Sequence, residues 1–78
     1  MTPDEADQRI IVSRGTLAAY IQGIQQTGVY PIADLALVHE EICLLEAIAE
    51  KYPSKGMQVL ELVTWWTAFE ANVRGKMN

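Results

Sequence analysis

Cysteine and basic residues are scarce in this chain of 78 residues. The single cysteine, Cys43, excludes an internal disulfide bond and fits a reducing compartment, so we expect a cytoplasmic protein. Six lysines and arginines stand against ten aspartates and glutamates, which gives a net charge of −4. Because duplex binding draws its affinity from Lys and Arg placed against phosphates, this balance argues against direct binding of nucleic acid. It also argues against anionic membrane surfaces.

Long hydrophobic runs are absent as well. None approaches the ~20 apolar residues that a membrane-spanning helix needs. The first residues include Asp4, Glu5 and Asp7 where a secretory signal would be basic and then apolar. We therefore expect a protein without a membrane partner.

Apolar residues recur at helical spacing in three segments. This pattern predicts an all-α fold, a small three-helix up-down-up bundle that forms a single helical domain over residues 1–78. The expected helices cover residues 3–26, 31–52 and 55–74. Thr2 and Glu5 flank Pro3 as a capping box, and Gly28 is a typical helix stop. Gly15 leaves open a kink or a restart within the first helix.

Each predicted helix has an apolar face for the core. In the first helix this face comprises Ala6, Ile10, Leu17, Ile21 and Ile24. In the third helix the apolar residues form a seam, with a spacing that alternates between three and four residues. This seam comprises Val59, Leu62, Trp66, Phe69 and Val73. The second helix has an apolar face broad enough to contact two neighbours.

The second helix also carries charge of one sign. Glu40, Glu46 and Glu50 share one arc of its projection, and no lysine or arginine precedes Lys51 within it. This arc is either a solvated face or a docking surface for a basic partner. In the first case its carboxylates pair with arginines of neighbouring helices, for which the candidates are Arg9, Arg14 and Arg74.

Two further residues have two interpretations each. Glu41 projects near the middle of the apolar arc, where a carboxylate needs a partner or must be neutral. It either reaches water or a cross-helix arginine, or it anchors a contact to another chain. Trp65 lies at the edge of the third helix's seam and either covers the flank of the core or anchors an interface. Met57 and Leu60 lie far from that seam and indicate exposed apolar surface.

Residues for catalysis or metal binding are lacking. His39, Glu40 and Cys43 match only the first half of an HExxH pattern, and no third ligand follows, so we expect neither a metal nor a cofactor. A nucleophilic pair of Cys43 and His39 would lack an orienting group and a pocket. We therefore expect a protein that is not an enzyme.

Two resemblances bear on function. Residues 28–35 resemble the turn and second-helix opening of a helix-turn-helix, which would imply DNA binding through a helix that here is acidic. In size, acidity and lack of catalytic residues the chain is similar to the small acidic proteins that phages and mobile elements use as inhibitors, anti-CRISPR proteins among them. That similarity implies inhibition of a nucleic-acid-binding machine by occupation of its basic surface.

The sequence thus favours an acidic protein-binding module. We expect it to dock on a basic surface of a partner protein through Glu40, Glu41, Glu46, Glu50 and Trp65. One alternative is a structural homodimer, assembled through the tryptophan face or through the small residues Gly15, Ala19 and Gly23. A degenerate helix-turn-helix regulator is a further alternative.

Overall fold

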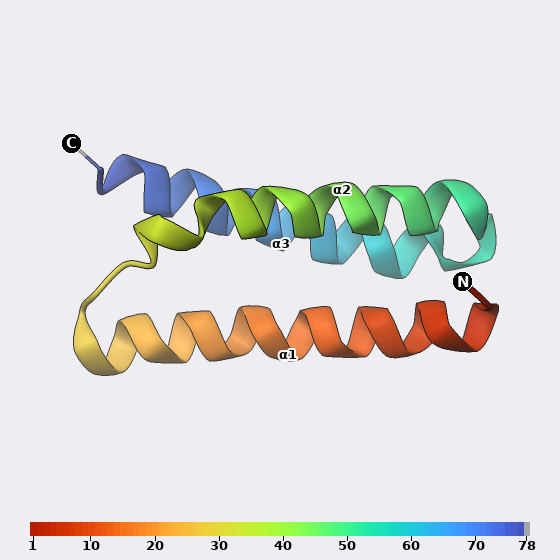
Figure 1. Ribbon diagram of the computed structural model, residues 1–78, viewed down its shortest axis with the longest axis horizontal. Coiled ribbons are helices and arrows are strands. Elements are labelled where there is room, and N and C mark those ends of the chain that lie inside the picture. The colour runs from red at the N-terminus through yellow and green to blue at the C-terminus, as the bar shows by residue number, and fades with distance from the viewer. Residues whose placement is uncertain (78) are drawn as a thin grey trace.

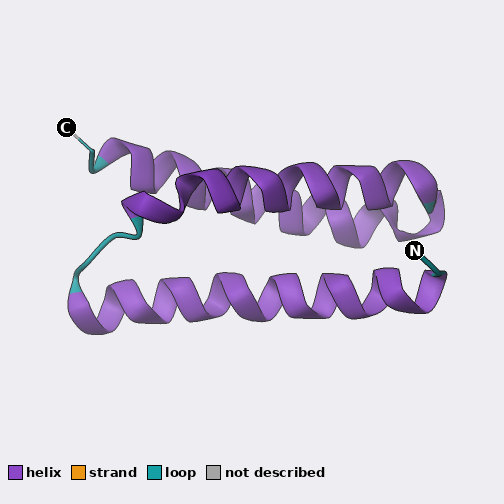
Figure 2. Cartoon of the chain, in the orientation of Figure 1, coloured by secondary structure: helices purple, strands orange, loops and turns teal. Residues whose placement is uncertain are grey.

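Three α-helices make up nearly all of the computed structural model, which describes residues 1–77 (Figures 1 and 2). Helix α1 spans Pro3–Thr27, α2 spans Leu35–Lys51 and α3 spans Gly56–Gly75. Single 3-10 turns at Ile32–Asp34 and Pro53–Lys55 precede α2 and α3. Successive helices run in opposite directions, so the predicted all-α up-down-up bundle is confirmed. No helix within the described residues is long and apolar enough to cross a membrane.

Helix α1 has the ends that its local sequence predicts. The Thr2 hydroxyl accepts a hydrogen bond from the Glu5 N–H at 3.2 Å, and the Glu5 carboxylate accepts one from the Thr2 N–H at 3.0 Å. Gly28 ends the helix in the left-handed region with φ of 71°. Between these ends the helix continues through Gly15 without a break, so neither a kink nor a restart occurs there.

Helices α2 and α3 begin later than expected. Pro31 leads into a 3-10 turn, and α2 starts only at Leu35. The Asp34 side chain makes no capping bond, and its Oδ2 accepts a hydrogen bond from the Tyr20 hydroxyl of α1 at 2.9 Å. Gly56 is the first residue of α3, and the side chain at its N-cap, Lys55, forms no capping bond either.

The core follows the predicted seams with one correction in α1. All five seam residues of α3 are buried, as are Ala6, Ile10 and Leu17 of α1. Ile21, however, is 41% exposed, and Ser13 is fully buried in the seam instead. The reason is a tertiary contact, since the Trp66 indole N–H donates to the Ser13 hydroxyl at 2.8 Å.

Helices α2 and α3 pack closely as a hairpin, whereas α1 stands further from both in the ribbon (Figure 1). Large side chains fill the space between α1 and the hairpin. The rings of Tyr20 and Phe69 lie 5.5 Å apart between centroids, and Trp66 meets both rings edge-on at 6.1 and 5.9 Å. This aromatic cluster is the central packing between α1 and the hairpin.

Candidate functional site

The basic side chains of the chain are mostly engaged within the fold. Three of them form ion pairs with carboxylates, namely Arg9 with Glu41 at 2.5 Å, Lys55 with Asp7 at 2.6 Å, and Arg74 with Glu70 at 3.7 Å. Two more lie over tyrosine rings, Lys51 over Tyr52 and Lys76 over Tyr30. The first two ion pairs tie α1 to the hairpin.

Glu41 belongs to this internal group. Its side chain is 14% exposed and reaches across to Arg9 of α1, while its Oε2 atom has no hydrogen-bond partner among the described residues. The structure therefore shows the cross-helix arginine that the sequence offered as one interpretation. This ion pair joins α1 to α2, and Glu41 does not belong to the exposed acidic surface.

The remaining glutamates of α2 lie on the outside. Glu40, Glu46 and Glu50 are exposed, and none forms an ion pair within residues 1–77. Two of the three arginines that could have neutralised them are directed elsewhere, since Arg9 contacts Glu41 and Arg74 contacts Glu70. At 3.6 residues per turn, Glu46 and Glu50 lie about 40° apart on α2, with Glu40 about 80° beyond Glu50.

An apolar groove of about 260 Å³ runs between α2 and α3 on the outside of the hairpin. Its lining consists of Glu46, Ala49, Gly56, Val59, Leu60 and Val63. Glu46 is the one charged side chain among these described residues, and Leu60 at the rim is 63% exposed. The exposure of Leu60 was predicted from the sequence, but the groove was not. The small residues Ala49 and Gly56, which line it, were the available signal.

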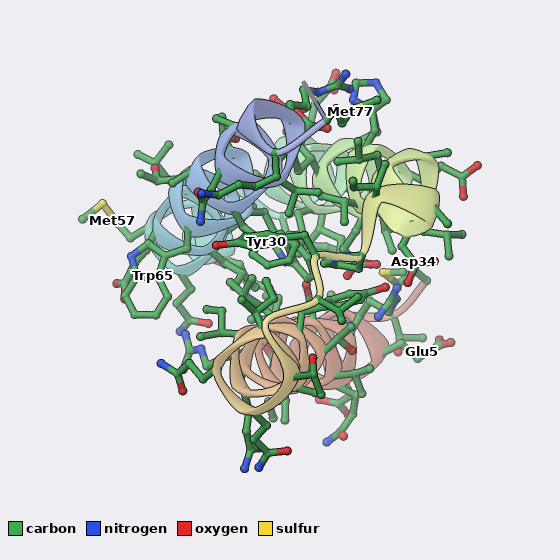
Figure 3. The ribbon with its side chains drawn as sticks, turned by 90° about the vertical axis from the view of Figure 1, so that its left-hand side faces the viewer. Glu5, Tyr30, Asp34, Met57, Trp65 and Met77 are labelled. Atoms are coloured by element: carbon green, nitrogen blue, oxygen red, sulfur yellow. The ribbon has the colours of Figure 1, made fainter. Side chains whose placement is uncertain are left out.

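Trp65 lies on a different side of α3. Its side chain is 55% exposed, and together with Leu17 and Ile21 of α1 it lines a separate groove of about 390 Å³. Figure 3 shows Trp65 and Met57 both pointing outward from α3. The structure thus separates Trp65, which lines the groove between α3 and α1, from Glu46, which lines the groove between α2 and α3. Trp65 and the acidic arc of α2, which the sequence predicted to form one docking surface, therefore lie on two separate surfaces.

His39 and Cys43 have a third neighbour that the sequence did not reveal. The His39 Nδ1 atom lies 3.8 Å from Glu70 Oε2 of α3, and its Nε2 atom lies 3.8 Å from the Cys43 sulfur. An acid therefore stands where an orienting group would be needed. Both distances are longer than the 2.6–3.2 Å that is typical of a nucleophile and its base. Among the described residues, no group of three or more His, Cys, Asp or Glu side chains is placed so that it could hold a metal ion.

The helix-turn-helix resemblance at residues 28–35 falls on the connection between α1 and α2. These two helices run antiparallel in the bundle (Figure 1), whereas a DNA-binding helix-turn-helix crosses its helices at about 90–120°. No family model, curated protein or solved structure matches the chain.

Proposed function

We propose that this protein is a non-enzymatic binding module of the cytoplasm that docks on a basic surface of a partner protein. The exposed carboxylates of α2 are the docking residues, with Glu46 and Glu50 at the centre and Glu40 at the edge. Where the partner surface normally binds nucleic acid, the docked module competes for it and acts as an inhibitor.

One observation carries this proposal. The outer glutamates of α2 form no ion pair with any residue that the structure describes, while Arg9, Lys55 and Arg74 are held by other carboxylates. Glu46 and Glu50 are a like-charge pair four residues apart, which destabilises a helix by a few tenths of a kcal/mol. A basic partner would offset that repulsion. Such charge complementarity mainly raises the association rate and the specificity.

The test is a double charge reversal. Glu46→Lys combined with Glu50→Lys changes the net charge from −4 to 0, because each reversal adds two positive charges. We expect the double variant to lose its partner in a pull-down from the native host's lysate, while its helical circular dichroism is unchanged. The wild-type interaction should weaken as salt rises, because exposed charges are screened.

A matched control separates a docking surface from a general charge effect. Asp4→Lys combined with Glu61→Lys makes the same change in net charge at two exposed positions away from α2. Partner recovery should be close to that of the wild type in this control. Equal loss in both double variants, or equal retention in both, would contradict the proposal.

A structural homodimer is the second candidate function. The groove beside α1 favours it, because Leu17, Ile21, Trp65, Ala68, Phe69 and Asn72 line it without a charged side chain. Two acidic chains can meet there without opposing their carboxylates. Sedimentation at high concentration decides this point, since the wild type should be dimeric and Trp65→Ala monomeric. A monomeric wild type would eliminate this candidate.

A further inference from the structure

We propose that the groove between α2 and α3 receives one aliphatic side chain of a basic amphipathic helix. In this arrangement a Lys or Arg one helical turn from that side chain pairs with Glu46 or Glu50. The inference rests on the proposed function and names the chemistry of the partner: a helix with an apolar anchor and cationic flanks. It also assigns the anchor site to the groove beside Glu46, with Trp65 lying outside the contact.

The size of the groove favours a side chain over a small molecule. Its volume of about 260 Å³ falls below the roughly 300–1,000 Å³ of pockets that enclose drug-sized ligands. The walls are aliphatic, formed by Ala49, Val59 and Val63, and they carry one carboxylate, that of Glu46. An aliphatic anchor would bury the exposed face of Leu60 and gain free energy in proportion to the apolar area removed from water.

The carboxylates around the groove favour basic residues on either side of the anchoring side chain. Glu46 forms part of the wall, and Glu50 lies one turn further along the same helix, about 6 Å away at 1.5 Å per residue. The ammonium of the adjacent Lys51 is directed to other groups, since it donates to the Met1 carbonyl at 3.2 Å and lies over the Tyr52 ring. A cationic segment is therefore attracted to this groove and an acidic one is repelled.

The shape of the surface favours a helix as the partner element. The groove lies between two antiparallel helices, and the small residues Ala49 and Gly56 leave room for a third backbone to approach. A helix presents residues three and four apart on one face. That spacing matches an anchor in the groove with a cation beside Glu46 or Glu50.

The probe for this inference is a synthetic Ala-rich peptide of about 20 residues, long enough to be helical in water. It carries one central leucine, with an arginine four positions before and four positions after it. Titration into isotope-labelled protein should shift the amide resonances of Gly56, Leu60 and Val63 most. Replacing the leucine by serine should weaken binding by about tenfold or more.

A variant of the protein, in place of a change in the peptide, tests the same groove. Gly56→Leu places a side chain in the groove, and a Cβ atom at Gly56 meets nothing within 4 Å in a helical backbone with φ of −56°. We expect binding of the leucine peptide to fall at least tenfold, as estimated for loss of the anchor, with the fold intact. Gly75→Leu is the matched control, since Gly75 is also unobstructed but lies at the far end of α3.

The outcomes separate this inference from the proposed function. If the serine and leucine peptides bind equally and both depend on Glu46 and Glu50, acidic docking stands and the groove is not the anchor site. If the leucine peptide binds equally well to the double charge-reversal variant, the proposed function fails as well. Resonance shifts around Trp65, or no shifts at ~1 mM peptide, would overturn the inference.

Discussion

The inner and outer sides of the α2–α3 hairpin differ in whether their polar side chains have partners within the protein. On the inner side, which α1 covers, Trp66 donates to Ser13 and Glu41 pairs with Arg9. On the outer side Glu46 and Glu50 lie beside an apolar groove and form no ion pair within residues 1–77. The inner pairs exist because burial makes an unpaired polar group costly, whereas water supports the outer carboxylates. Residue type alone therefore does not separate a structural glutamate from a candidate docking glutamate; the presence of an internal partner does.

The largest expected effect comes from the two adjacent tryptophans. Trp66 is buried to 1% exposure in the aromatic cluster, whereas Trp65 is 55% exposed. Trp66→Ala should lower the free energy of unfolding by about 3–5 kcal/mol, through lost contacts and a cavity. Trp65→Ala should lower it by under about 1 kcal/mol. Urea denaturation followed by circular dichroism measures both changes.

Trp66→Phe provides a variant that keeps a ring in the core if the alanine variant does not fold. It should be less stable than the wild type by an amount between those of the two alanine variants. Similar losses at positions 65 and 66 would show that the two sides of α3 are not as different as their burial indicates.

A smaller difference in stability is expected between alanine variants of two glutamates of α2, Glu41 and Glu46. Glu41→Ala removes a charged hydrogen bond to Arg9, which is 34% exposed, so we expect a loss of about 1–2 kcal/mol after allowing for solvent screening. Glu46→Ala relieves repulsion with Glu50 and should raise stability by a few tenths of a kcal/mol. Thermal unfolding at neutral pH and low salt measures both. A destabilised Glu46→Ala protein would indicate an internal role for Glu46.

The smallest effect concerns Tyr20, whose hydroxyl donates to Asp34. Burial, together with the hydrogen bond to Asp34 and its charge, raises the pKa of Tyr20 above its ordinary value of 10.0. The unfolded chain therefore loses this proton first, so stability is fully present below pH 10 and is lost as pH rises through the pKa of the folded protein. Tyr20→Phe should have a shallower alkaline decline in urea midpoint than the wild type. Identical slopes in the two proteins would contradict the assignment to Tyr20.

Local signals account for the parts of the fold that the sequence predicted well. The capping box at Thr2 and the stop at Gly28 each depend on residues within a few positions, and the seam of α3 is a regular repeat of large apolar side chains. The burial of Ser13 is different, because a polar residue enters an apolar seam only when a partner from another helix is present. That partner, Trp66, lies 53 residues away in the chain.

The candidate site was predictable only within single helices. A helical projection gives the angle between Glu46 and Glu50 on α2 but not the rotation of α2 relative to α3. For this reason the sequence grouped Trp65 with the acidic arc, whereas the structure places it beside Ile21. The pairing of Glu41 with Arg9 likewise depends on the register of α1 against α2.

The close α2–α3 hairpin has a consequence for folding kinetics. Its two helices are joined by the short segment Tyr52–Lys55, so most of their contacts require only a small loop to close. Proteins with such local contacts fold in microseconds to milliseconds. We expect the hairpin to form in the folding transition state and α1 to dock later, which would give low φ-values at Ser13 and Tyr20 and high ones at Leu45 and Val59.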